Sequence, residues 1–499
     1  MNILKQTILL LLSVMLLSCS SDKSVSATLE QPTETELSFE GIGGTLFTYV
    51  TLANAIPELT SDQEWCVPSV AVTNADKHTI AIAVAENETT ESRTAIVTIS
   101  YDNVSYNITI SQAAQTASQD DDTLYSLGLG WNLGNQLDAY ANGVSDETCW
   151  GNPKATQELF DAVKKAGYSS VRIPITWMGH IGEAPTYTID SDWMNRVGEI
   201  VGYAENAGLK AIINLHHDGA ASEKGVYNGW LQIGKAATDA TVNTETKAKI
   251  KAIWTQIAEY FKAKGNFLIF EGFNEIHDGG WGWGDNRNDG GKQYSVFNEW
   301  LQVFVDAVRA TGGNNATRYL GIPGYDTDAE ITMASLKLPT DPANHLLVAI
   351  HYYSPYEYTL EDSVSQWGHT AASDKKVSYG DESEMKAMFQ KIKEKYIDNN
   401  IPVYLGEFGC VRRSNATAEL FRRYYLEYIC KAAKTYNLSL IFWDNGSTET
   451  GREASGLFNR TTGAYLNTDA ENAVSAMIKG YNTTDTNYTL ETVYANAPK

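Results

Sequence analysis

Two glutamates, Glu275 and Glu407, lie at the ends of apolar runs and are the first candidates for chemistry. The run Phe267–Phe270 precedes Glu275 in the stretch FLIFEGFNE, and its lack of polar alternation predicts a strand buried on both faces. Val403–Gly406 precedes Glu407 in the same way. Carboxylates are rarely buried without a partner, so two of them at the ends of core strands indicate a shared site. The plain alternative is that each strand runs out into a solvated loop.

A facing pair of glutamates is suited to breaking a glycosidic bond. One carboxyl must be protonated to donate to the leaving oxygen, and the other must be ionised to attack or support the anomeric carbon. Burial and a nearby negative charge raise one pKa, while Arg and His donors lower the other. A separation of about 5 to 5.5 Å gives retention of configuration and about 6.5 to 9.5 Å gives inversion.

Strand and helix patterns alternate along most of the chain and predict the scaffold that positions these glutamates. The helical patterns include Ser191–Asn206 and Thr246–Lys264. Eight repeats of this kind predict an α/β fold, a (β/α)8 TIM barrel with insertions. A doubly wound open sheet is the alternative, but no glycine-rich phosphate loop follows the first strand, so nucleotide binding has no support. The strand candidates are Leu127–Leu133, Ser169–Thr176, Lys210–His217, Phe267–Phe270, Tyr319–Ile322, Leu346–Tyr353, Pro402–Glu407 and Ser439–Trp443.

Polar and aromatic residues gather at the carboxyl ends of these predicted strands, where barrels place their active sites. Arg172 is also a candidate partner for Glu271 in the core. Neighbours on a regular strand point to opposite faces, so one of the two adjacent histidines is expected to be a structural hydrogen-bonder. Asn274 and Glu275 can share a site only if the strand twists or bulges there. The candidates are Asn135, Arg172, His216, His217, Asn274, Glu275, His351, Tyr353, Glu407 and Trp443.

Seven short motifs, in order along the chain, resemble glycoside hydrolase family 5. The first two resemble subfamily 4, a group of endo-glucanases and xyloglucanases. The resemblance spans roughly residues 123–476 and departs from the family at Cys149, where serine or alanine would be less surprising. The motifs are Trp131–Asn135 (WNLGN), Glu147–Pro153 (ETCWGNP), Val171–Pro174 (VRIP), Asn214–His217 (NLHH), Asn274–Glu275, His351–Tyr353 (HYY) and Gly406–Gly409 (GEFG).

The resemblance implies a role for each matched residue. Glu275 would be the general acid/base and Glu407 the nucleophile of a retaining double displacement. Arg172 would support the nucleophile and Tyr353 would donate to it, while Asn274 would bind the sugar 2-hydroxyl. The other matched residues would contact substrate: His216 and His351 along the glycone side of the cleft, Trp443 under the reacting sugar, and also Asn135 and His217.

Loop tryptophans are candidates for further sugar subsites. Trp281 and Trp283 follow the Glu275 strand in a Gly- and Asp-rich loop, Asp278–Gly291, which could equally be a plain connector. The others are Trp150, Trp177, Trp230 and Trp367. The chain contains 12 Trp and 28 Tyr, and flat amphipathic rings suit sugar faces.

The amino-acid composition limits which kinds of molecule the protein is expected to bind. The net charge is −23 over 499 residues, which argues against nucleic acid because phosphate binding needs basic patches. No cofactor and no metal is expected, since a metal-dependent hydrolase using His216, His217 and Asp218 would need three consecutive ligands. We expect a β-linked polysaccharide substrate, β-glucans such as xyloglucan or mixed-linkage glucan, and a monomer. A mannanase, a xylanase and a non-catalytic surface glycan-binding protein are the alternatives.

The N-terminal quarter of the sequence has the pattern of a membrane-anchored module. Residues 1–19 read as a signal peptide ending in a lipobox, Leu-Leu-Ser-Cys, with Cys19 as the lipidation site of a Gram-negative outer-membrane lipoprotein at the cell surface or in the periplasm. An ordinary secretory signal is the alternative. Residues 20–36 predict a flexible tether, 37–114 a β-sandwich, 115–123 a linker, 124–482 the barrel and 483–499 a tail.

The sandwich resembles the BACON module of carbohydrate-active enzymes. It shows no evident aromatic cluster, so we interpret it as a spacer, with carbohydrate binding as the alternative. Besides Cys19 the chain has Cys66, Cys149, Cys410 and Cys430, too few for a disulfide framework. We expect buried free thiols, with Cys410 and Cys430 able to pair if the fold brings them together.

Overall fold

The computed structural model describes residues 27–39, 44–74, 76–85, 87, 89, 91–114 and 124–499. The chain divides into two compact units between Asp121 and Asp122, and each is described by itself. Cys19 and the predicted linker 115–123 lie outside the described residues. No helix within the described part of the chain is long and apolar enough to cross a membrane.

The first unit is an all-β sandwich, as predicted. One sheet has the strand order β1-β7-β6-β3 and the other β2-β5-β4. Alternate residues of β6, Ala95, Val97 and Ile99, point inward and meet β-branched residues of β5 and β7 in a buried core. The strands are β1 (Glu36–Phe39), β2 (Gly44–Thr51), β3 (Glu58–Ser61), β4 (Cys66–Asn74), β5 (Lys77–Val84), β6 (Arg93–Tyr101) and β7 (Val104–Gln112).

Two features of the sandwich differ from the expectation. The segment expected to be a tether, 20–36, packs in its second half: Leu29 is 1% exposed, and the Glu30 amide donates to Thr51. One apolar residue in a polar stretch is enough to anchor it. Phe47 and Tyr49 are exposed on the same face of β2, although no aromatic cluster is evident in the sequence.

The second unit is a closed barrel of parallel strands in the order β11-β12-β15-β16-β17-β18-β19-β8, which confirms the (β/α)8 fold. β8 pairs with both β11 and β19, so the open-sheet alternative is wrong. Every residue of β8, β11 and β18 is buried, as the apolar runs predict. The barrel strands are β8 (Leu129–Leu133), β11 (Ser170–Ile173), β12 (Lys210–Asn214), β15 (Leu268–Glu271), β16 (Leu320–Pro323), β17 (Leu346–Tyr352), β18 (Val403–Phe408) and β19 (Ser439–Asp444).

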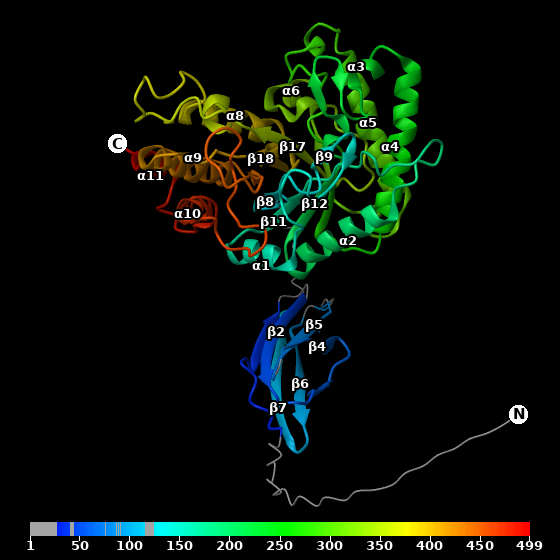
Figure 1. The fold of residues 1–499 in the computed structure, drawn as a ribbon, viewed down its shortest axis with the longest axis vertical. Helices are drawn as coiled ribbons and strands as arrows, with labels where there is room; N and C mark the ends of the chain where they lie inside the picture. Colours follow the sequence, from blue (N-terminus) through cyan, green and yellow to red (C-terminus); the bar gives the residue numbers. More distant parts are fainter. Residues whose placement is uncertain are drawn as a thin grey trace, which may run out of the picture. The chain divides into compact units, whose positions relative to one another are not determined.

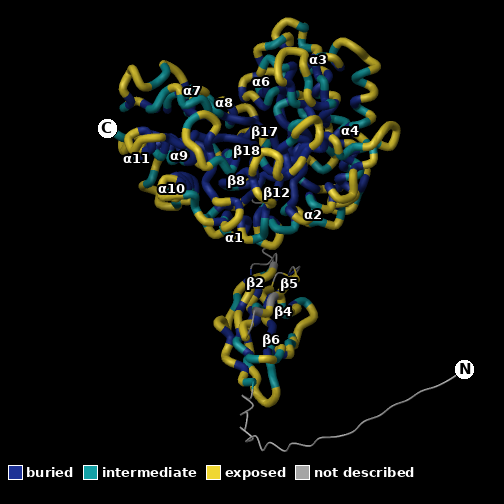
Figure 2. Tube along the Cα trace, in the orientation of Figure 1, coloured by how far each residue is buried: buried dark blue, intermediate teal, exposed yellow. Residues whose placement is uncertain are grey.

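Helices surround these strands (Figure 1), and the tube in Figure 2 is buried along the strands and exposed on the outer faces of the helices. Polar caps define several helix starts: Asp190 accepts from the Trp193 amide and Asn415 from the Ala418 amide. The helices are α1 (Gln157–Lys165), α2 (Ser191–Asn206), α3 (Ile233–Ala236), α4 (Ala240–Tyr260), α5 (Lys292–Ala310), α6 (Ala329–Ser335), α7 (Tyr356–Thr359), α8 (Glu382–Lys395), α9 (Ala416–Thr435), α10 (Thr468–Asn482) and α11 (Leu490–Ala495).

Two small hairpins, β9 (Tyr140–Ala141) with β10 (Val144–Ser145) and β13 (Ala221–Glu223) with β14 (Val226–Tyr227), lie in barrel loops. The tail expected at 483–499 contains α11 instead. Leu490 and Val493 of α11 are buried in the core of the barrel unit, because apolar residues three apart share one helix face.

The four described cysteines are free thiols. Cys410 and Cys430 are both buried but do not form the bond left open above, and Cys149 is exposed. Burial raises the pKa of the Cys410 thiol, which keeps it protonated.

Candidate active site

Arg172, on β11, lies at the centre of the polar cluster inside the barrel mouth and is fully buried. All five of its N–H groups are used. Nε and Nη2 donate to Glu271, with the shortest contact at 2.7 Å, and Nη2 also donates to Asn274 Oδ1 at 2.7 Å. Nη1 donates to Asn132 Oδ1 at 3.1 Å and to Glu407 Oε1 at 2.8 Å. Arg172 thus has both of the roles expected of it: it forms a core ion pair with Glu271 and contacts Glu407 in the site.

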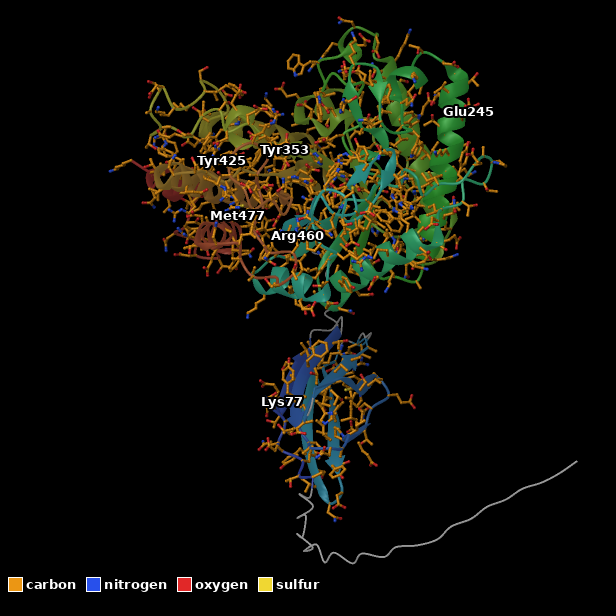
Figure 3. All side chains as sticks on the ribbon, in the orientation of Figure 1. Lys77, Glu245, Tyr353, Tyr425, Arg460 and Met477 are labelled. Carbon is orange, nitrogen blue, oxygen red and sulfur yellow. The ribbon has the colours of Figure 1, made fainter. Side chains whose placement is uncertain are left out.

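Glu407, on β18, is held through both carboxylate oxygens. Oε1 accepts from Arg172, and Oε2 accepts from the Tyr353 hydroxyl at 3.1 Å (Tyr353 is labelled in Figure 3). The register of β17 against β18 shifts between Ile350 and His351, so an irregularity in the pairing lies where these side chains enter the site. Two donors on separate oxygens suit an ionised carboxylate.

Glu275 lies beyond the end of β15 and faces Glu407 across His351. Its φ is 41°, a left-handed conformation rare for a residue with a side chain. His351 Nδ1 is 2.7 Å from Glu275 Oε1 and 3.7 Å from Glu407 Oε2. One oxygen of each glutamate and the imidazole nitrogen all lie within 4.8 Å of one another. The glutamate side chains are 23% and 8% exposed, so Glu275 is the more open to the cleft.

The two carboxyls have pKa values shifted in opposite directions. Burial raises the pKa of Glu407 above its usual range, and the charge of Glu275 adds to this against His351 and Arg172. Burial also acts on Glu275, but the His351 hydrogen bond and the charges of neighbouring histidines outweigh it, so the pKa of Glu275 is lowered. With Glu275 bonded to His351, a shared proton therefore favours Glu407.

His216 and His217 both lie at the site, because β12 ends at Asn214 and the chain turns into a short 3-10 helix at His217–Gly219. Their rings contact each other at 4.4 Å. The expectation that a strand would point one of them away is therefore wrong. His216 pairs with the Asn214 amide at 3.2 Å, and burial lowers the pKa of His216 and of His217, the latter to about 4, so both are neutral.

The Trp443 indole, at the end of β19, lies parallel to the His216 ring with centroids 5.9 Å apart. Gly134 makes this position available, since a Cβ there would lie 2.8 Å from the indole. Asn135, the next residue, has φ 54°, and its backbone N–H donates to Asp138 Oδ2 at 3.1 Å. Gly406 likewise leaves room for His351, with a Cβ position 3.2 Å from Nε2.

Three rings continue the site beside His216. Tyr140, Trp150 and His217 have pairwise centroid distances of 5.6 Å. Asp138 lies beneath them, with its carboxylate 3.8 Å from His217 Nε2, and burial raises the pKa of Asp138 to about 7.

The loop Asp278–Gly291 follows Glu275 in the chain. The Asp278 carboxylate accepts from the amides of Gly280 and Asp285 and from the Gln293 side chain, which holds the loop in shape. Trp281 stacks on the buried His277 ring at 4.2 Å and is 58% exposed. This loop is therefore a built structure that presents an indole, not a plain connector.

The other loop tryptophans fall into two groups. Trp150 and Trp283 are exposed, and Arg287 covers the Trp283 ring. Trp177 and Trp367 are buried in the core, so the expectation that they offer subsites is wrong. Trp230 is partly buried, with its indole N–H donated to Asp218.

Two groups of described residues place three ligand-capable atoms close together: Asp138, His216 and His217, and separately Glu275, His351 and Glu407. Asp218, the carboxylate of the metal alternative, turns instead to the Trp177 amide and the Trp230 indole. We assign no metal to either group. The Asp138 carboxylate accepts from the backbone N–H groups of Asn135 and Gln136, and His216 Nδ1 pairs with Asn214. In the second group, His351 contacts both glutamates.

Four polar residues of the cluster are missing from the predicted list of site residues: Asn132, Asn214, Tyr404 and Glu271, the last of which was expected only as a core partner of Arg172. Each is buried and points from a barrel strand into the network around Arg172; Tyr404 donates to Glu271 Oε2 at 2.6 Å. Asn132, Asn214 and Glu271 interrupt apolar strands, and that interruption was the available signal.

A parallel (β/α)8 barrel that carries two carboxylates, an arginine and aromatic rings at its carboxyl edge defines a glycoside hydrolase. Comparison with known proteins agrees. Residues 137–449 match the family model described as cellulase (glycosyl hydrolase family 5), and the chain belongs to this family. Residues 56–113 match the BACON model, described as a putative binding domain, N-terminal.

Individual relatives cover one or both units. A GH5-4 broad specificity endoglucanase from Bacteroides salanitronis is 58% identical, with TM-score 0.69, covering 72% of this chain and 94% of that one. A Bacteroidetes-affiliated GH5 cellulase linked with a polysaccharide utilization locus is 46% identical, with TM-score 0.73 and coverage of 75% and 96%. A xyloglucan-specific endo-beta-1,4-glucanase from Bacteroides ovatus is 32% identical over 95% of this chain and 96% of its own length.

Proposed function

We propose that the protein is a retaining endo-β-1,4-glucanase in which Glu407 is the nucleophile and Glu275 the general acid/base. The observation that carries this is the spacing of the carboxylates, whose nearest oxygens lie within 4.8 Å. That spacing suits a covalent double displacement and leaves no room for the water that an inverting enzyme needs between its carboxyls.

In the first step, Glu407 attacks the anomeric carbon while the bond from that carbon to the leaving oxygen breaks. The proton of Glu275 goes to the leaving oxygen, and a glycosyl ester of Glu407 remains. Arg172 and Tyr353 hold one Glu407 oxygen each and aim the carboxylate. The Asn274 amide, oriented by Arg172, supports binding of the sugar 2-hydroxyl.

Proton donation requires Glu275 to be protonated, so His351 must change partners when substrate binds. Its Nδ1 needs to move only from Glu275, at 2.7 Å, toward Glu407, at 3.7 Å. This move removes the hydrogen bond that lowers the pKa of Glu275 and stabilises the charge on Glu407.

In the second step, water attacks the anomeric carbon, its proton returns to Glu275, and the ester bond to Glu407 breaks. The loss of the Glu407 charge in the ester lowers the pKa of Glu275, so the same residue then acts as a base. The product keeps the β configuration.

For the substrate we propose β-1,4-glucans, with xyloglucan or mixed-linkage glucan favoured over plain cellulose. Similarity to a broad specificity endoglucanase and to a xyloglucan-specific one supports this. Two exposed rings on different loops, Trp150 beside His217 and Trp281 beside His277, support an elongated chain as ligand. A panel of β-glucans, xyloglucan, mannan and xylan with product sizing tests it, and faster release from mannan or xylan would favour the alternatives.

The mechanism is tested by proton NMR of the first product and by Glu407→Ala. We expect the β-anomer to appear first and the variant to lose activity on the order of 10⁴-fold or more while its melting curve stays cooperative. An α-anomer formed first, or near-normal turnover by a folded variant, would contradict the proposal.

We also propose that Cys19 is lipidated and that the protein is an outer-membrane lipoprotein, as the lipobox pattern suggests. A monomer remains our expectation for its oligomeric state.

A further inference from the structure

Glu271 is a buried carboxylate to which the mechanism above gives no role. It is the last residue of β15 and is 1% exposed. Its oxygens accept from Arg172, from the Asn214 amide at 2.9 Å and from the Tyr404 hydroxyl at 2.6 Å. Each of these partners comes from a different barrel strand, so the carboxylate is fixed on several sides.

Arg172 is a single cation shared by two carboxylates. One edge of its guanidinium, Nε and Nη2, contacts Glu271, while Nη1 contacts Glu407 at 2.8 Å. The remaining donors go to the neutral Asn132 and Asn274. The positive charge therefore has two competing anions, and only Glu407 reacts with the sugar.

We propose that Glu271 is a positioning residue whose charge limits how strongly Arg172 stabilises the ionised Glu407. This inference rests on the proposed function, in which Glu407 is the nucleophile. A carboxylate bound to an uncompensated arginine would be readily ionised but weakly nucleophilic. The negative charge of Glu271 offsets the arginine, so the ionised Glu407 keeps its reactivity.

The charges on Arg172 and Glu271 are maintained in the barrel. Burial opposes the charge on Arg172, but Glu271 and Glu407 outweigh it and raise the pKa of Arg172. Burial likewise acts against ionised Glu271, and Arg172 and Tyr404 overcome it, so the pKa of Glu271 is lowered. Both shifts favour the charged form of the group.

Other titratable groups lie around Glu407 and Arg172, and a substitution at Glu271 does not remove them. Arg172 on β11, Glu275 after β15, His351 on β17, Tyr353 after it and Asp138 after β8 interact with Glu407 itself. His216 and His217 after β12 interact with the charge of Arg172, and Tyr404 on β18 with Glu271. A shift caused by Glu271→Gln must therefore be compared with a variant that keeps its charge.

The test is the pH dependence of kcat/KM in Glu271→Gln, which removes the charge and keeps an oxygen for Arg172. Loss of a negative charge favours ionisation of both catalytic carboxyls. We expect the acidic and the basic limb both to move to lower pH, by about one unit, and kcat to fall about tenfold. A folded Glu271→Gln with unmoved limbs would overturn the proposal, because a purely structural role lowers kcat without moving them.

Tyr404→Phe is the matched control and gives the opposite sign. It keeps the Glu271 charge but removes the hydroxyl that partly neutralises it. We expect the acidic limb of the Tyr404→Phe profile to move to higher pH. If Glu271→Gln fails to fold, Tyr404→Phe alone tests the role of Glu271. An unmoved acidic limb in Tyr404→Phe would then refute that role. Glu407→Ala in the same assay separates the two proposals. An active Glu407→Ala refutes the function, whereas unmoved limbs with an inactive Glu407→Ala refute only the role of Glu271.

Discussion

The backbone at Glu275 explains how two adjacent residues reach one site. β15 ends at Glu271, and Glu275 has φ 41°, so the chain is no longer a strand where Asn274 and Glu275 face the cleft. Such a conformation is costly for a residue with a side chain and is typical of functional positions. The sequence shows that both side chains are polar, but a left-handed turn at a glutamate has no sequence signature.

Glu275→Ala tests the acid/base role. Without the acid, hydrolysis of poor leaving groups should fall by about 10²- to 10⁴-fold, while an aryl cellobioside with an acidic leaving group should lose far less in its first step. Added azide should restore turnover of the aryl substrate and give a β-glycosyl azide, measured by NMR.

Glu275→Gln is the control, since it keeps the shape and removes the proton. An α-configured azide, or equal losses on both substrates, would show that Glu275 does not act as the acid/base.

At the scale of elements, strand ends carry the chemistry and loops carry the exposed rings. Polar residues that follow apolar runs, such as Arg172 and Glu407, could be predicted because the carboxyl ends of parallel strands meet at one edge. The pairing of Arg172 with Glu271 was among the expectations, since a buried carboxylate needs a partner. The meeting of His216 with His217 could not be predicted, because it depends on where β12 ends.

Loop residues were harder to predict than strand residues. Trp177 and Trp281 both follow a strand, yet the first is buried and the second is 58% exposed. Composition does not separate them, since exposure depends on which loops pack together. The packing of Leu29 and of α11 was not predicted for a related reason. Each lies in a polar segment, and its few apolar residues pack into a core formed by residues distant in the sequence.

Trp281→Ala tests whether the loop that follows Glu275 binds sugar. We propose that its indole stacks on sugar units on the leaving-group side, so its removal should raise KM for long oligosaccharides about tenfold, or ~1.4 kcal/mol. Hydrolysis of an aryl cellobioside, which has no sugar there, should be unchanged.

Trp283→Ala in the same loop is the control, because it removes a second exposed ring, which Arg287 contacts on one face, and leaves the Trp281 ring in place. Equal effects of the two substitutions on KM would mean that the loop as a whole, and not the Trp281 ring, is responsible.

At the scale of the whole molecule, the chain consists of two separately packed units, and the predicted lipid attachment site precedes the first packed strands in the sequence. The sandwich matches a model described as a putative binding domain, and its Phe47 and Tyr49 rings are exposed. The order of the units follows from composition alone, whereas which sandwich residues are exposed depends on strand pairing.

Cys19→Ser tests the proposed anchor. The native protein expressed in a Gram-negative host should incorporate labelled palmitate and enter the detergent phase on partitioning, and the variant should do neither. Its kcat/KM on soluble glucan should stay within about twofold, since the barrel is a compact unit of its own. Equal labelling of both proteins would mean that Cys19 is not the attachment site.

The separation of the glutamates from the exposed rings has a consequence for engineering. Main-chain pairing of β15 with β16, β16 with β17 and β17 with β18 sets the distance between the strand ends that carry Glu275 and Glu407. Trp150 and Trp281 lie on segments outside that pairing. Replacing these two segments with those of a related enzyme should therefore change which polysaccharides are hydrolysed. The anomeric configuration of the released sugar should stay that of the original enzyme.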